Sequence, residues 1–176
     1  MHCPACKTEE LAPTQLENGL TGLGCAACGG VLVPVPAARQ WAESVDANSW
    51  AGHVEAVGIS DSAAAMNCPK CAHFMGKFRI DAGVENRLDL CAHCGEFWLD
   101  AGEWSLLGAL ELRQQLPSLF SQPWQLGVRQ REAAVDREQR LRDTLGEADH
   151  ARVQAFATWL SGHPHASLIR RRLAIG

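Results

Sequence analysis

The sequence predicts a small α+β protein: two tandem three-stranded zinc ribbons, each with four cysteine ligands, followed by a C-terminal α-helical region. All eight cysteines of the 176-residue chain fall into CxxC pairs, and hairpin-like stretches separate the pairs. The last third of the chain has helical periodicity instead. We expect zinc ribbon 1 at 1–37, a linker at 38–65, zinc ribbon 2 at 66–100 and three to four helices at 101–176.

The cysteines form two quartets of proposed metal ligands. Four thiolates in two CxxC pairs are the ligand set of a closed tetrahedral Zn²⁺ site, so we expect two Zn²⁺ per chain. Such small units cannot bury an adequate core alone, and a structural zinc ion contributes about 10–16 kcal/mol of apparent binding energy to folding. The proposed ligands are Cys3, Cys6, Cys25 and Cys28 in the first quartet, and Cys68, Cys71, Cys91 and Cys94 in the second.

A complete quartet leaves no open coordination position for water, which disfavours hydrolytic zinc chemistry. The sequence also lacks a readable Ser/His/Asp set or a Gly-rich phosphate loop, so we expect no enzyme. Histidines beside the cysteines could replace a ligand, but each quartet is already complete without them. We therefore expect His2, His73 and His93 to be satisfied elsewhere or exposed to solvent.

The first ribbon is predicted from turn chemistry. Asn18-Gly19 favours a hairpin turn between arms at 11–16 and 20–23, because both residues tolerate positive φ. Gly29-Gly30 follows the second CxxC pair, where a metal knuckle often needs a left-handed residue. The stretch 31–35 reads as a third strand, and Pro34 and Pro36 either confine it to an edge or end it.

The second ribbon repeats this plan. Cys28 and Cys94 are separated by 66 residues and Cys3 and Cys68 by 65, which indicates an internal duplication. Alternating apolar residues predict hairpin arms around Phe78 and Leu88, and 96–99 reads as the third strand. Between the ribbons, a short helix at 38–45 is expected. Trp41 and Trp50 either pack back on the ribbons or form an exposed binding site, and we favour packing.

The string from Cys68 to Glu103 resembles the bacterial transcription factor IIB-type zinc-ribbon family. It reads C-P-K-C, then D-L-C-A-H-C-G-E-F-W-L-D-A-G-E, and the W-L-D-A-G-E end is its specific part. The resemblance implies a three-stranded ribbon around Zn²⁺ with the four cysteines as ligands, and it implies no established activity. It covers about 40 residues. The first ribbon shares only its cysteines and Gly29-Gly30.

The W-L-D-A-G-E end has two interpretations. Asp100 as an N-cap with Glu103 at N3 predicts a capping-box helix start, which accounts for the residues structurally. Alternatively, Trp98 contributes to a surface that a partner reads. Phe97 and Trp98 alternate on the strand, so one should face the hairpin and the other the helix or solvent.

The tail is predicted to be helical. Helices are expected at 101–116, 124–145 and 147–160, with a last helix starting at Pro164. The 124–145 helix has a dense charged surface and one thin apolar stripe. It is either a surface helix or a seam for a homodimer.

Charge separates the candidate partners. The chain has a net charge of −4, which argues against a general nucleic-acid binder. However, the last two helices also fit a helix-turn-helix whose second helix carries Arg170, Arg171 and Arg172. We expect a non-catalytic zinc-binding adaptor that presents ribbon and helical surfaces to a protein partner, with transcription or other macromolecular machinery as the candidate. The alternative is nucleic-acid binding by the Arg-rich helices.

No signal peptide or membrane span is visible, so a cytoplasmic location is expected.

Overall fold

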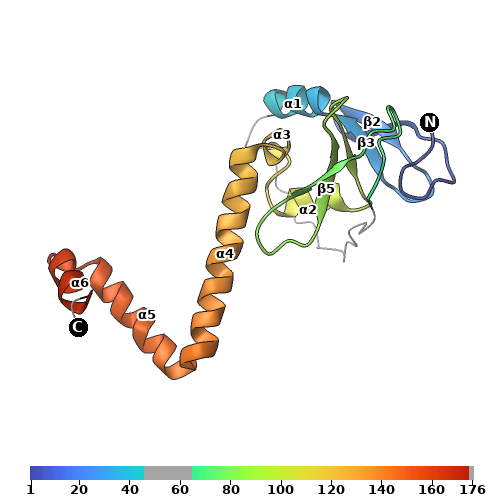
Figure 1. Ribbon diagram of the computed structural model, residues 1–176. Helices are drawn as coiled ribbons and strands as arrows, with labels where there is room; N and C mark the ends of the chain where they lie inside the picture. Colours follow the sequence, from blue (N-terminus) through green and yellow to red (C-terminus); the bar gives the residue numbers. More distant parts are fainter. Residues whose placement is uncertain (46–64, 175–176) are drawn as a thin grey trace. The chain divides into compact units, whose positions relative to one another are not determined.

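The computed structural model describes residues 1–45 and 65–174 (Figure 1). It is a mixed α+β structure with one six-stranded antiparallel sheet in the order β1-β2-β3-β6-β5-β4. The described chain forms two compact units, 1–130 and 131–176. No helix among the described residues has the length and apolar character that a membrane crossing requires. Trp50 lies outside the described residues.

The first half of the sheet comes from the first two CxxC pairs. Strand β1 (Ala12–Glu17) pairs with β2 (Leu20–Gly24) across the Asn18-Gly19 turn, as the turn residues predict. The left-handed φ of +82° at Gly19 explains why glycine is needed there. Strand β3 (Val31–Pro34) then pairs with β2 and leads directly into helix α1 (Val35–Ser44).

The second half repeats this arrangement. Strands β4 (Gly76–Arg79) and β5 (Arg87–Cys91) form the hairpin, and β6 (Glu96–Leu99) pairs with β5. The two halves then join through their third strands, because β3 pairs with β6 in antiparallel register. The sequence predicts six strands in two groups of three, but it contains no sign that the groups form one sheet.

The junction of β3 and β6 has the symmetry of the duplication. With the offset of 66 residues that separates Cys28 from Cys94, Leu32 is equivalent to Trp98, and these two residues lie directly opposite each other. With the same offset, Val31 is equivalent to Phe97 and Val33 is equivalent to Leu99. The neighbouring pairs Val31–Leu99 and Val33–Phe97 are therefore equivalent to each other. The halves therefore meet as two copies would across a two-fold axis.

The two faces of the sheet carry different cores, as the alternation of side chains requires. One face packs with helices α1, α2 (Glu103–Ala109) and α3 (Leu116–Leu119), and its core includes Val33, Trp41 and Phe97. The other face packs Leu32 and Trp98 among cysteines of both quartets. Trp41 is 2% exposed and donates its indole N–H to the Asn18 carbonyl, so it packs back on the sheet as expected.

Two predicted helix boundaries are wrong. The helix expected at 101–116 spans only 103–109, because Glu111 adopts a left-handed φ of +57° that ends it. Pro117, expected to stop that helix, instead lies in the first turn of α3, where its missing N–H costs nothing.

The tail forms three further helices. They are α4 (Gln122–Leu145), α5 (Glu147–Ser161) and α6 (Ala166–Ala174), so the last helix begins two residues after the Pro164 start that we expected. Within the 131–176 unit, the buried His150 donates to Glu138 at 2.6 Å and Gln154 donates to the same carboxylate at 2.6 Å. These bonds connect α5 to the C-terminal half of α4.

Candidate metal centres

The eight predicted ligands gather into two clusters of four. Within each cluster, all four Sγ atoms lie within 4.8 Å of one another. The shortest separations are 3.5 Å for Cys3–Cys28 and Cys6–Cys25, and 3.4–3.6 Å in the second cluster. These are far longer than a disulfide bond of about 2.05 Å, and close to the ~3.8 Å edge of a tetrahedron with Zn–S bonds of about 2.3 Å. Each cluster could hold one metal ion, and a set of four thiolates suits zinc.

Each CxxC pair forms a tight turn that directs both thiols inward. In all four turns, the residue after the second cysteine donates its N–H to the carbonyl of the first, at 2.8–3.1 Å. That residue always has a left-handed φ. The four are Lys7 (60°), Gly29 (71°), Ala72 (61°) and Gly95 (68°).

Lys7 and Ala72 are knuckle residues that the sequence did not reveal. The left-handed region costs a residue with a Cβ about 1–2 kcal/mol, so glycine is the usual sequence sign of a left-handed turn residue. Only the other two turns have a glycine at this position. The offset of 65 residues between Cys3 and Cys68 also separates Lys7 from Ala72, so the duplication itself was the signal available.

Burial and hydrogen bonding divide the thiols of a cluster into two kinds. Burial raises the pKa of Cys28 to about 12, against weaker lowering by the Gly30 N–H, and burial also raises the pKa of Cys3. In contrast, the Thr8 hydroxyl donates to Cys6 at 3.2 Å and lowers the pKa of that thiol to about 6. In the second cluster, burial raises the pKa of Cys68, and it raises that of Cys94 to about 12. A metal ion must therefore displace protons from at least two thiols per cluster near neutral pH.

The histidines near the quartets lie outside both clusters, within the part of the chain that the structure describes. His73 and His93 stack on each other beside the second cluster, with ring centroids 3.9 Å apart and an interplanar angle of 10°. Both clusters consist of cysteine alone, as the complete quartets led us to expect.

Trp98 does not lie on the surface that we considered for it. Its side chain has 0% exposure, because the alternation of β6 directs it onto the face of the sheet that carries the cysteines. The indole N–H donates to the Asp100 carboxylate at 2.8 Å. A Cβ at Gly30 would lie 2.1 Å from the Trp98 ring, so Gly30 is required for contact between the halves. Phe97 is also buried on the opposite face, so neither aromatic faces solvent.

The W-L-D-A-G-E end begins α2 differently from the capping box we predicted. The helix starts at Glu103, and Gly102, with φ of +87°, takes the N-cap position without a side-chain bond. Half of the box is present, since the Glu103 carboxylate accepts from the Asp100 N–H at 2.8 Å. The Asp100 carboxylate accepts from the Trp98 indole N–H. The motif therefore ties the indole to the first turn of α2.

The remaining predicted surface lies in the tail. Arg170, Arg171 and Arg172 are all exposed on α6. The tail also exposes large apolar side chains, with Phe156 at 43% and Trp159 at 52% on α5. These two rings lie 5.4 Å apart and form a continuous aromatic patch. This patch was not among the surfaces expected from the sequence.

The chain has been compared with known proteins at three levels. No protein-family model, no curated protein sequence and no solved structure matches it.

Proposed function

We propose that this chain is a non-catalytic, tandem zinc-ribbon adaptor whose two Zn²⁺ ions stabilise a platform for a macromolecular partner. The observation that carries the proposal is the pair of all-cysteine clusters, each with four Sγ atoms within 4.8 Å. Four protein ligands complete a tetrahedral zinc site, so zinc would act on folding and not on a substrate. The resemblance of residues 68–103 to the transcription factor IIB-type zinc-ribbon family supports the same proposal.

The partner surface in this proposal is the aromatic patch of Phe156 and Trp159. Trp98 is buried, so the surface must lie elsewhere, and large exposed apolar groups are typical of protein interaction sites. Tryptophan and phenylalanine also supply much contact area with little loss of side-chain entropy. We infer a protein partner, and transcription machinery is the candidate that the family resemblance suggests.

Two experiments test the adaptor proposal. Native mass spectrometry of the purified chain should show two zinc ions, and a chelator should abolish the fold of the 1–130 unit. Affinity capture should then compare the native chain with Phe156→Gln/Trp159→Gln and with Leu126→Gln, a control that replaces an apolar residue 51% exposed on α4. Loss of the captured partner only in the double variant is expected. Equal capture by all three chains would refute the aromatic patch.

The second candidate function is nucleic-acid binding through α6. The specific observation in its favour is three consecutive exposed arginines on one short helix. Phosphate contacts from these residues would make the affinity fall steeply as salt increases. Titration of duplex and single-stranded oligonucleotides at low and moderate salt separates the candidates. Absence of binding at low salt would eliminate this second function.

A further inference from the structure

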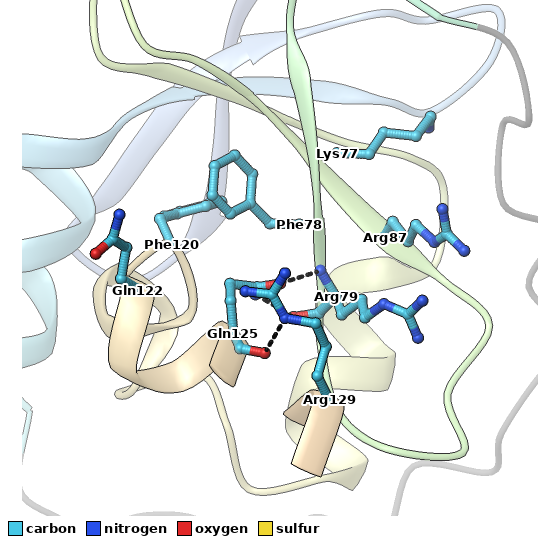
Figure 2. Close-up of a pocket in the computed structure, with 8 residues that line it drawn as sticks. All are labelled: Lys77, Phe78, Arg79, Arg87, Phe120, Gln122, Gln125 and Arg129. Carbon is cyan, nitrogen blue, oxygen red and sulfur yellow. Dashed lines mark hydrogen bonds between the residues drawn. The ribbon is translucent and has the colours of Figure 1, made fainter. Parts of the chain in front are cut away.

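The two halves of helix α4 have different surroundings. In the first half, the Gln125 side chain accepts from the Arg79 N–H at 3.2 Å and donates to the Arg79 carbonyl at 2.8 Å (Figure 2). Val128 in the same half is fully buried, so this half is fixed on the edge of the sheet. The second half, 131–145, belongs to the 131–176 unit, and none of its residues is buried. The packing that covers α4 therefore ends within the helix.

The 131–176 unit has almost no core of its own. Among its described residues, 131–174, only His150 and Leu160 are buried. A unit of about 45 residues is close to the size below which a chain needs a disulfide, a metal or a second chain to fold. Both cysteine clusters lie in the other unit, so zinc cannot supply that stability. A second chain could supply it by covering the exposed apolar residues of the unit.

Three hydrogen-bonded side chains mark the sides on which α4 and α5 approach each other. The Glu138 carboxylate on α4 accepts from His150 and from Gln154 on α5, both at 2.6 Å. Because this carboxylate already has two donors, it can be buried further at little cost.

The same sides of the two helices carry exposed apolar residues. At 3.6 residues per turn, Leu141 and Leu145 lie on the side of α4 that carries Glu138. Val153 and Ala157 likewise lie on the side of α5 that carries His150 and Gln154. We call these two sides the inner faces. Their apolar members are exposed, with Leu141 at 39%, Leu145 at 38% and Val153 at 44%.

The connection between the helices keeps the inner faces apart. Gly146 alone separates Leu145, the last residue of α4, from Glu147, the first residue of α5. Two residue steps span at most about 7 Å, whereas packed helices lie about 8–10 Å apart, and helical hairpins use connections of about 2–8 residues. The second half of α4 and α5 accordingly diverge from their junction (Figure 1). The α5 helix therefore cannot fold back along α4 and cover its inner face.

The borders of the two inner faces carry opposite charges. Arg137 and Arg142 lie on either side of the α4 inner face, and Glu147 and Asp149 lie on either side of the α5 inner face. One such pair, Arg142 with Glu147, meets at 3.9 Å at the junction within the chain. The α4 inner face of one copy thus complements the α5 inner face of a second copy in charge as well as in apolar character. A surface that complements itself in this way is what a two-fold interface requires.

The size of the inner faces is sufficient for a dimer. The second half of α4 and the 15 residues of α5 are each about 22 Å long, and a helix is about 10 Å wide. Together they offer several hundred Å² per chain, on the order of the 800 Å² that each partner buries in a standard interface.

We propose that the 131–176 unit forms a two-fold homodimer, in which the α4 inner face of each copy packs on the α5 inner face of the other. This surface is distinct from the aromatic patch, because Phe156 and Trp159 lie about 160° and 140° around α5 from Gln154. The proposal goes beyond the adaptor function. A dimer would present two aromatic patches and so bind a repeated partner with higher avidity.

Sedimentation velocity of the full zinc-loaded chain, from about 1 to 100 μM, tests the proposal. A dimer with a dissociation constant in the micromolar range or below is expected for an interface of this size. Leu141→Glu and Val153→Lys each place a charge on one inner face, of the same sign as the borders of the face it meets. Each should weaken dimerisation at least tenfold. Ala155→Lys is the matched control, because it adds the same charge to the outer side of α5 at an exposed position.

A longer connection tests the geometry without changing either face. Insertion of Gly-Ser-Gly after Gly146 should let α5 fold back on α4 of its own chain. Dimerisation should then weaken at least tenfold while the helical content is retained. Circular dichroism of every variant separates dissociation from loss of the helices.

Four results would overturn the proposal. They are a monomer at about 100 μM, where an interface of this size should be occupied, native dimerisation of Leu141→Glu and Val153→Lys, equal weakening by Ala155→Lys, and unchanged dimerisation after the insertion. The Phe156→Gln/Trp159→Gln chain should stay dimeric, and its dissociation would assign dimerisation to the aromatic patch instead. A monomeric chain that still captures its partner through that patch would refute the dimer and leave the adaptor proposal standing.

Discussion

Replacing Gly30 by alanine should destabilise the junction between the two halves of the sheet. An added Cβ would lie 2.1 Å from Cζ2 and 2.7 Å from Cε2 of Trp98. The indole cannot easily move, because it is fully buried and its N–H is bonded to Asp100 at 2.8 Å. Restoring ordinary contact needs a shift of more than about 1 Å. Overpacking costs about 1–3 kcal/mol, and we expect the upper end of that range.

The measurement is the urea dependence of unfolding of the zinc-loaded chain, followed by tryptophan fluorescence and near-ultraviolet circular dichroism. Gly76→Ala on β4 is the matched control, because its Cβ would meet only ordinary contacts at 3.4 and 4.0 Å. The control should change the free energy of unfolding by less than about 1 kcal/mol. Combining Gly30→Ala with Trp98→Leu should cost less than the sum of the single changes, since both act at one contact. Equal urea midpoints of unfolding for Gly30→Ala and Gly76→Ala would refute the role of the close contact between Gly30 and Trp98.

Three further predictions concern the metal centres and the sheet edge. Cys28→Ser and Cys94→Ser should each leave one zinc ion per chain in native mass spectrometry, and retention of two would contradict separate quartets. Lowering the pH should release zinc, because protons compete for thiolates whose pKa burial has raised in the metal-free chain. With two such thiols per cluster, the dissociation constant should rise about 100-fold or more per pH unit between about pH 7 and pH 5, as measured with a chromophoric chelator. Gln125→Ala removes three hydrogen bonds and should cost about 1–3 kcal/mol, measured by urea unfolding with Gln122→Ala as the control outside that bridge.

Local signals predicted the strands and the grouping of the cysteines well. Asn18-Gly19, the CxxC spacing and the alternation around Phe78 each depend on residues close in sequence, and the strands lie at or near those positions. The clustering of the cysteines also follows the predicted quartets. These features are determined by turn geometry and side-chain alternation, which a sequence displays directly.

Long-range contacts could not be predicted in the same way. The pairing of β3 with β6 joins residues about 66 positions apart, and no local pattern marks it. As a result, the burial of Trp98 and the close approach of Gly30 were missed. The bridge between α4 and the sheet edge was missed for the same reason, since the Gln125 side chain meets the Arg79 backbone only after α4 docks there. The prediction of one helix at 101–116 was wrong because the apolar periodicity of the sequence continues past Glu111, where the left-handed backbone ends the helix.

The junction at Leu32 and Trp98 has a consequence for the assembly of such modules. A single three-stranded half would expose β3 as an open edge that is complementary to a second copy of itself. Two separate halves would then pair only at sufficient protein concentration. Within one chain, the residues between α1 and β4 keep the partner edge at a high effective concentration, so the pairing is independent of dilution. Duplication thus converts an interface that would require dimerisation into part of the fold.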